Sequence, residues 1–344
     1  MVSESRRPSH VRAGLPDLLS DGPVLWITAP GRAKRSENHK TRSERIEGDQ
    51  MKPTSDQDRT QKVTSKDGTK IVARVRGQGP PVVLLPAGPG DSELSWRHVV
   101  PFLSERCTCY LLETRGRGES ADHPDHSPDR LVEDVLACAE SIGEPIGLVG
   151  WGSALAVRVA ARTGAPVFAV ALYELGAGEA MSPESGKRMG EVFAGVGKLV
   201  AQGRLDDAAR AFIEGSDVIY SEEDLATGAP AEFWKAAAPR LPLFLQESKQ
   251  AREAGQPGAT SPQELGKITM PVLLLHGDHT SQWFSDSVKH VAEHVPDSTV
   301  RQIPGAAHFG PYTHPRAVTD ELGRFFTEVH AHARPSAEAE RQPA

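Results

Sequence analysis

Continuous apolar runs alternate with stretches of helical periodicity along most of this chain. The runs at 81–85, 109–112 and 167–173 are apolar at nearly every position, which is typical of strands buried on both faces. Over 131–142, between the second and third runs, apolar residues recur at helical spacing. Strands that alternate with helices predict an α/β fold, with a mostly parallel, twisted sheet and helices on both of its faces.

Two stretches, 58–177 and 265–332, carry this alternation. In the first, Asp67-Gly68 lies between two β-type segments and predicts a hairpin turn. In the second, the apolar run at 270–275 predicts a strand, and a closing helix is predicted from the spacing of Val318, Leu322, Phe325 and Val329. We interpret the two stretches as the two parts of one α/β core.

Residues 178–264 follow a different pattern. Apolar residues recur there at helical spacing, and no segment alternates as a strand does. One predicted helix has an apolar face made of Met189, Val192, Phe193, Val196 and Val200. We predict that this segment is a helical cap inserted between the two parts of the core.

The two ends of the chain lack such patterns. Residues 1–57 mix basic and polar residues without an apolar period, so they cannot offset the entropy of ordering, and we predict a disordered tail. Met51 lies just before the first structured pattern; our hypothesis that it is the natural start would be tested by N-terminal sequencing of the natively expressed protein. Residues 333–344 are predicted to be frayed.

Composition narrows the class of protein. The 344 residues carry a formal net charge of -7, which argues against a nucleic-acid partner because such proteins present a basic face. The three cysteines, Cys107, Cys109 and Cys138, do not make a disulfide framework. No apolar run is long enough for a membrane span or a signal peptide, so we expect a cytoplasmic protein without a membrane partner.

A short apolar strand at 146–149 is followed by a turn of small residues and a helical stretch. A sharp strand-to-helix turn of this kind presents the residue at its apex above the sheet. The residues around the apex are Gly150, Trp151, Gly152, Ser153 and Ala154.

Sterics favour Gly152 as the apex. In that register the residues two before and two after it are Gly150 and Ala154, which are small enough for the strand and the helix to pass closely. If Ser153 were the apex, the bulky Trp151 would stand at the first of these positions and crowd the turn. The backbone conformation at the apex of such a turn costs a residue with a side chain about 1–3 kcal/mol of strain. Glycine adopts the same conformation without that strain.

These motifs resemble, in the same order, those of the α/β-hydrolase superfamily with a helical cap, over about residues 60–332. The turn at Gly152 is similar to the family's nucleophile elbow, and 86–90 is similar to its His-Gly-Gly-Pro-Gly oxyanion loop. Residues 113–120 resemble Asp-x-Arg-Gly-x-Gly-x-Ser, and 305–309 resemble the Gly-x-x-His-Phe loop of the catalytic histidine. The resemblance implies a hydrolase-type fold and a small-molecule substrate.

Two positions of the family's catalytic triad depart from its pattern. The nucleophile position holds Gly152, and the usual position of the acid holds Thr280. Asp278 and Glu174, which follow two neighbouring predicted strands, remain as alternative acids. The resemblance implies that His308 is the catalytic histidine.

The candidate chemistry centres on His308, because imidazole takes and returns a proton near neutral pH. The backbone N–H groups of Gly88 and Ser153 are candidates for stabilising an oxyanion. Ser153 also carries the hydroxyl nearest to the apex, about 3.8 Å of chain away. It is therefore either a displaced nucleophile or a helix-start residue that accepts a backbone N–H.

The resemblance places three aromatic residues near the pocket mouth: Trp151, Trp283 and Phe284. There they either line an apolar or aromatic substrate site or pack in the core.

We predict an enzyme that acts on a small apolar or aromatic molecule, by ester-type hydrolysis or by a His308-dependent lyase, cyclisation or water-addition reaction. The alternative is a non-catalytic protein that binds a ligand or a partner. We expect no cofactor, since Gly116-Arg117-Gly118 lacks the spacing of a dinucleotide loop. We also expect no metal, since His276, Asp278 and His279 are neighbours in one turn, and such neighbours rarely converge on one ion without further ligands.

Overall fold

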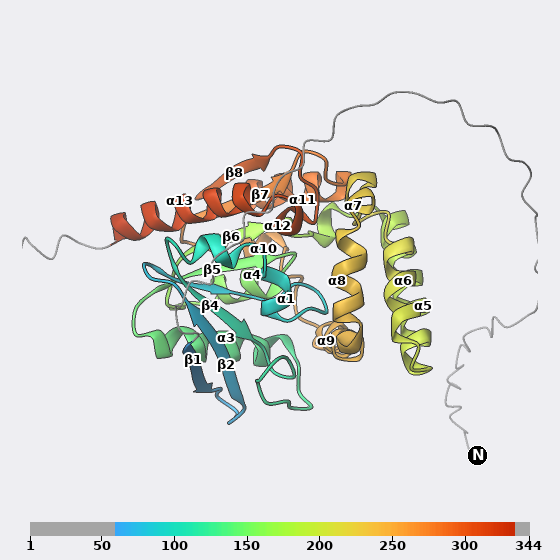
Figure 1. The fold of residues 1–344 in the computed structure, drawn as a ribbon, viewed down its shortest axis with the longest axis horizontal. Coiled ribbons are helices and arrows are strands. Elements are labelled where there is room, and N and C mark those ends of the chain that lie inside the picture. The colour runs from blue at the N-terminus through green and yellow to red at the C-terminus, as the bar shows by residue number, and fades with distance from the viewer. Residues whose placement is uncertain (1–58, 334–344) are drawn as a thin grey trace, which may run out of the picture. The chain divides into compact units, whose positions relative to one another are not determined.

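The computed structural model describes residues 59–333, which contain an eight-stranded sheet (Figure 1). The strand order is β1-β2-β4-β3-β5-β6-β7-β8; β1 and β2 are antiparallel to their neighbours, and the other strands are parallel. The strands are β1 Arg59–Thr64, β2 Lys70–Arg76, β3 Pro81–Leu84, β4 Thr108–Glu113, β5 Ile146–Trp151, β6 Val167–Tyr173, β7 Val272–Gly277 and β8 Ser298–Ile303. The predicted mostly parallel sheet is confirmed.

Successive residues of the central strands enter two separate hydrophobic cores, one on each face of the sheet. Leu84 of β3 packs in the same cluster as Phe326, whereas its neighbour Val83 packs in the same cluster as Val135. Both faces of a parallel sheet are covered by helices, so nearly every position of such a strand is apolar. This explains why the strands are visible in the sequence as continuous apolar runs.

Helices of the α/β core supply the other half of each cluster. They are α1 Ser92–Trp96, α2 Val100–Leu103, α3 Pro128–Ile142, α4 Ala154–Ala160, α11 Gln282–His294, α12 Gly310–Thr313 and α13 Pro315–Ala333. The helix expected from about Ser95 begins earlier, because the Asp91 side chain caps α1 by accepting the Leu94 N–H at 2.7 Å. In α13 the fully buried phenylalanine is Phe326, and the predicted Phe325 is only partly buried.

Residues 178–264 form helices and no strand, and we refer to this segment as the helical insertion. It holds η1 Gly178–Ala180, α5 Pro183–Ala201, α6 Leu205–Gly215, α7 Glu222–Thr227, α8 Ala229–Ala237, η2 Ala238–Arg240, α9 Leu241–Glu253 and α10 Pro262–Leu265. Helices α5, α6 and α8 stand together beside the sheet in Figure 1. That the insertion is a separate cap domain stays a prediction.

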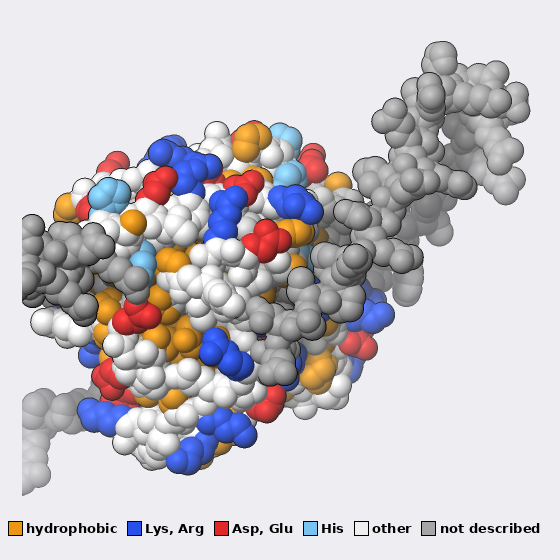
Figure 2. Space-filling view, turned by 60° about the vertical axis from the view of Figure 1, so that its left-hand side comes forward, with side chains coloured by type: hydrophobic (Ala, Val, Ile, Leu, Met, Phe, Trp, Pro, Cys, Tyr) orange, Lys and Arg blue, Asp and Glu red, His pale blue; other side chains and the backbone are white. Residues whose placement is uncertain are grey.

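The surface of the described residues carries charges of both signs. Acidic and basic side chains are interspersed on the face shown in Figure 2. No helix within 59–333 combines the length and the apolar character that crossing a bilayer requires. The predicted N-terminal tail, the hypothesis about Met51 and residues 334–344 of the predicted C-terminal tail lie outside the described part of the chain.

Candidate active site

The turn after β5 has the geometry that the register argument predicted. Gly152 has a left-handed φ of 59°, and α4 begins two residues later with Ser153 as its N-cap residue. A Cβ atom on Gly150 would lie 2.9 Å from Cβ of Ala156, so only glycine fits where the strand and the helix cross. The apex of the turn is therefore Gly152, and its conformation is one that glycine adopts without strain.

Gly152 stands directly in front of His308. A Cβ atom built on Gly152 would lie 3.7 Å from Cε1 of the imidazole. The residue at the apex of the turn is thus the one whose side chain would face the histidine, and it has none. The turn keeps the shape that presents a nucleophile while lacking the nucleophile itself.

Ser153 does not take over that place. It lines a second cavity on the other side of the turn, which it shares with Arg158 and Ser248, and it is absent from the walls of the cavity that His308 lines. Its hydroxyl makes no capping hydrogen bond, so the expected role of accepting a backbone N–H is wrong as well. The structure does not bring the Ser153 hydroxyl to the imidazole.

His308 and Glu174 form a hydrogen-bonded pair. Nδ1 of His308, on the loop between β8 and α12, lies 3.1 Å from Oε2 of Glu174, which directly follows β6 and is fully buried. Because an ionised carboxylate only accepts hydrogen bonds, this contact places a proton on Nδ1 and leaves Nε2 as the basic nitrogen. Glu174 has a φ of 44°, an unusual value for a residue with a side chain that is maintained by its partners.

Two of those partners come from the β7 end. The N–H of Gly277 donates to Oε1 of Glu174 at 2.9 Å, and the hydroxyl of Thr280 donates to Oε2 at 2.8 Å. Thr280 occupies the position where the family carries its acid, and here it orients the carboxylate that pairs with His308. The threonine at 280 and the carboxylate at 174 therefore belong to one arrangement.

Asp278, the other candidate for the acid, makes no hydrogen bond to His308 among the residues described. Its side chain is exposed, and Oδ1 accepts the N–H of Gly305 at 2.6 Å. It is a turn residue that closes the loop after β8. Between the two alternatives, the structure places Glu174 and not Asp278 beside His308.

Asp224, in the helical insertion, was missed in the sequence. Its carboxylate is buried and accepts the backbone N–H of His308 at 3.2 Å and that of Phe309 at 2.9 Å. Ser221 and Asp224 also form the capping box of α7. The sequence pattern of the capping box was available as a signal for a helix start, but it does not say which distant loop the carboxylate contacts.

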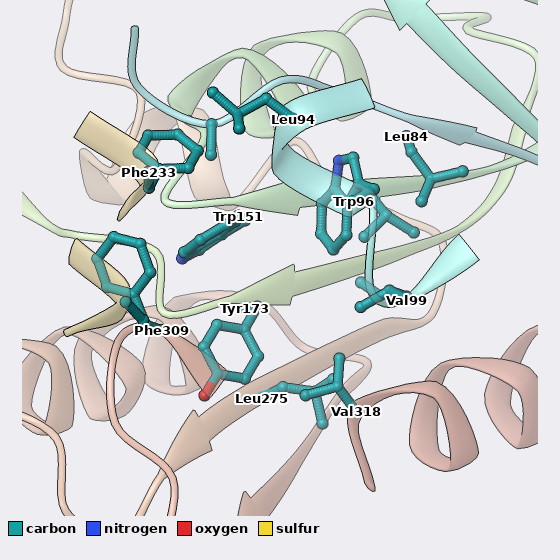
Figure 3. Packing of buried hydrophobic residues seen from close by; sticks show 14 of the residues in the cluster. Leu84, Leu94, Trp96, Val99, Trp151, Tyr173, Phe233, Leu275, Phe309 and Val318 are labelled. Atoms are coloured by element: carbon teal, nitrogen blue, oxygen red, sulfur yellow. The ribbon is translucent and has the colours of Figure 1, made fainter. Parts of the chain in front are cut away.

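An aromatic cavity of about 320 Å³ opens in front of His308. All three predicted aromatic residues line it, and Phe284 stacks on the imidazole with ring centroids 4.4 Å apart and planes 7° apart. Figure 3 shows the indole of Trp151 packed beside Phe233 and Phe309. The sequence did not reveal the contribution of the helical insertion, which includes Met189, Phe193, Phe212, Tyr220, Phe233 and Trp234.

The polar atoms of this cavity are few. Tyr220 contributes a hydroxyl that accepts the indole N–H of Trp234 at 2.7 Å, and burial raises the pKa of Tyr220, so this hydroxyl stays neutral at physiological pH. His308 is the one residue with an ionisable nitrogen among those that line the cavity. The cavity therefore fits an apolar or aromatic molecule that meets the imidazole at one end.

Gly88 lies beside the turn, after β3. Its φ is 46°, and neither its backbone N–H nor that of Ser153 donates to an acceptor among residues 59–333. Arg117 holds this loop in place by donating to the carbonyl oxygens of Gly88 at 3.3 Å and of Gly90 at 3.0 Å. Two unpaired N–H groups next to Gly152 are what an oxyanion site requires.

Comparison with known proteins agrees with this architecture. Residues 82–321 match the model of the alpha/beta hydrolase family. The soluble epoxide hydrolase of Corynebacterium sp. (strain C12) is 25% identical over 271 residues, which cover 74% of this chain and 92% of that protein.

Solved structures show the same fold. A thermophilic esterase from Thermogutta terrifontis superposes with a TM-score of 0.65 at 20% identity, covering 79% of this chain and 99% of that one. A bromoperoxidase from Bacillus anthracis superposes with a TM-score of 0.63 at 20% identity, covering 78% and 100%. Since the family model spans most of the described sheet and helices, this chain belongs to the alpha/beta hydrolase family.

Proposed function

We propose that this protein is an enzyme that hydrolyses a small aromatic ester with a water molecule activated by His308, without a covalent intermediate. The observation that carries the proposal is the pairing of His308 with Glu174 in front of Gly152, a residue without a side chain. A paired and oriented imidazole is the requirement for general-base catalysis. The nucleophile that a covalent mechanism needs is missing from the place where the imidazole could activate it.

In the proposed reaction, Nε2 of His308 removes a proton from water while the water oxygen attacks the carbonyl carbon. The carbonyl oxygen becomes an oxyanion, which the N–H groups of Gly88 and Ser153 stabilise. The C–O bond to the alcohol then breaks, and the imidazolium returns its proton to the leaving oxygen. Glu174 stabilises the imidazolium and keeps the ring in the correct tautomer. The products are a carboxylic acid and an alcohol.

The aromatic cavity supports the substrate class. Its walls offer rings for stacking and edge contacts, which favour an aromatic group over a flexible chain of the same size. Among the relatives, one is named as an epoxide hydrolase and another as an esterase. The first compounds to assay are therefore aryl esters and aryl epoxides, because water hydrolyses both.

The test measures turnover of this panel by the wild type, Ser153→Ala and His308→Ala, together with labelling by a fluorophosphonate probe. We expect turnover without labelling in the wild type, and turnover lowered by about 10²–10⁴-fold in His308→Ala. For panel compounds that carry no carboxylate, we expect Ser153→Ala to keep turnover. Labelling of the wild type that disappears in Ser153→Ala would refute the non-covalent mechanism and restore Ser153 as the nucleophile.

A non-catalytic ligand-binding role is the second candidate, and the glycine at position 152 is the observation that favours it. It predicts that panel compounds bind without turnover and that His308→Ala leaves all measurable function intact. Turnover that depends on His308 excludes this role as the whole function.

A further inference from the structure

The second cavity, of about 240 Å³, lies between α4, α9 and the loop that precedes α3. It shares Gly88, Gly152 and Phe244 with the aromatic cavity, so the two cavities adjoin at the turn. A Cβ atom built on Gly88 would meet no atom within 4 Å, whereas one built on Gly152 would contact the His308 ring. The two cavities therefore share part of their walls at Gly88 and Gly152.

The two cavities differ in chemistry. The polar residues that line the second cavity are Thr114, Arg117, His126, Ser153, Arg158, Glu247 and Ser248. Arg117 is neutralised by the carboxylate of Glu247, with NH2 and Oε2 2.8 Å apart. The hydroxyl of Ser153 has no hydrogen-bond partner among residues 59–333.

Arg158 is the uncompensated charge of this cavity. It donates from NH1 to the amide oxygen of Gln256 at 3.1 Å and from NH2 to the carbonyl oxygen of Pro257 at 3.0 Å. Both acceptors are neutral, and no carboxylate among residues 59–333 forms an ion pair with it. A guanidinium without a counter-ion at the wall of a cavity is suited to bind a carboxylate.

We propose that the second cavity binds a carboxylate group of the substrate, with Arg158 as the counter-charge and the Ser153 hydroxyl as a further donor. The aromatic part of the same molecule occupies the aromatic cavity, and the reacting bond lies between the two, beside Gly152. The inference rests on the proposed function for the choice of the aromatic cavity as the substrate site. It assigns Ser153 to substrate binding instead of nucleophilic attack.

The experiment compares the binding of phenylalkanoic acids, from phenylacetate to phenylvalerate, with that of their primary amides, by calorimetry and by quenching of tryptophan fluorescence. Trp151 and Trp234 line the aromatic cavity, so quenching reports the aromatic part. We expect the acid of the best-fitting length to bind about tenfold or more tightly than its amide. The protein's net charge of -7 repels anions, so such a preference has a local origin.

Arg158→Gln is expected to abolish the acid preference while amide binding stays unchanged. The matched control is Arg162→Gln, because Arg162 is exposed, pairs with Asp129 and lines neither cavity; it is expected to keep the preference. Acids that bind no more tightly than amides, or an equal loss in both variants, would overturn the inference.

The outcome is separable from that of the proposed function. His308→Ala should lose turnover and keep the acid preference, since His308 does not line the second cavity. If no ester or epoxide is turned over but Arg158→Gln still removes the preference, the carboxylate site stands and the catalytic proposal fails.

Discussion

A Cβ atom at Gly152 would point at His308, with 3.7 Å between it and Cε1 of the ring. The protein thus has a histidine, a carboxylate that is hydrogen-bonded to it and a turn whose apex faces it, while the residue at that apex has no side chain. This relationship makes the missing nucleophile a local feature that a single substitution can restore.

We expect a fluorophosphonate probe to label the Gly152→Ser variant at the new serine. We expect the same probe not to label the wild type. The φ of 59° at this position makes the substitution strained, so we expect a loss of about 1–3 kcal/mol in the free energy of unfolding. Gel fluorescence and urea denaturation measure the two effects. Gly152→Ala is the control for strain alone, and Gly152→Ser combined with His308→Ala should not be labelled. Equal labelling with and without His308 would show that the imidazole does not activate this position.

Glu174→Gln should lower kcat/KM by about 10²–10⁴-fold. The amide can donate to Nδ1 and so favours the tautomer that places the proton on Nε2, which removes the base. Asp278→Asn is the matched control, because Asp278 is exposed and bonds Gly305 instead of the imidazole. If the Asp278 variant loses as much activity as the Glu174 variant, the assignment of the acid is wrong.

Asp224→Asn should lower both kcat and stability. An amide group cannot accept both backbone N–H groups in the positions where the carboxylate accepts those of His308 and Phe309. We expect about 1–3 kcal/mol less free energy of unfolding. Glu222→Gln, on the exposed side of α7, is the control. A variant that is destabilised but keeps its kcat and its pH–rate profile would limit Asp224 to a structural role.

Glu113→Gln should change how stability depends on pH. Burial of Glu113, with a further contribution from Asp91, raises its pKa to about 7 from an ordinary value of 4.5. Between these two values the folded protein holds a proton that the unfolded chain has lost, so the stabilisation is complete below about pH 4.5 and is lost as the pH rises through 7. The change amounts to about 3 kcal/mol. Urea denaturation at pH 5 and pH 8 should therefore show a smaller loss of stability in the variant than in the wild type, and an unchanged loss would contradict the prediction.

The sequence alone determined most of the fold and the position of the histidine. The strands buried on both faces are apolar at nearly every position, and the turn at Gly150 and Gly152 needs small residues, so both are local requirements that neighbouring residues reveal. His308 was visible because its loop has a short motif of its own. The boundaries of α1 and the choice of Phe326 over Phe325 depended on side-chain contacts and were less exact.

Only the tertiary structure decided which of these residues meet. Glu174 and His308 are far apart in the chain, and both Asp278 and Glu174 follow a strand, so spacing could not choose between them. The absence of Ser153 from the cavity that His308 lines and the contact of Asp224 with the His308 loop likewise depend on how the turn and the helical insertion pack. A hydrogen bond depends on the distance and direction between two atoms, and for residues this distant in sequence those are set by the packing of the whole sheet and its helices.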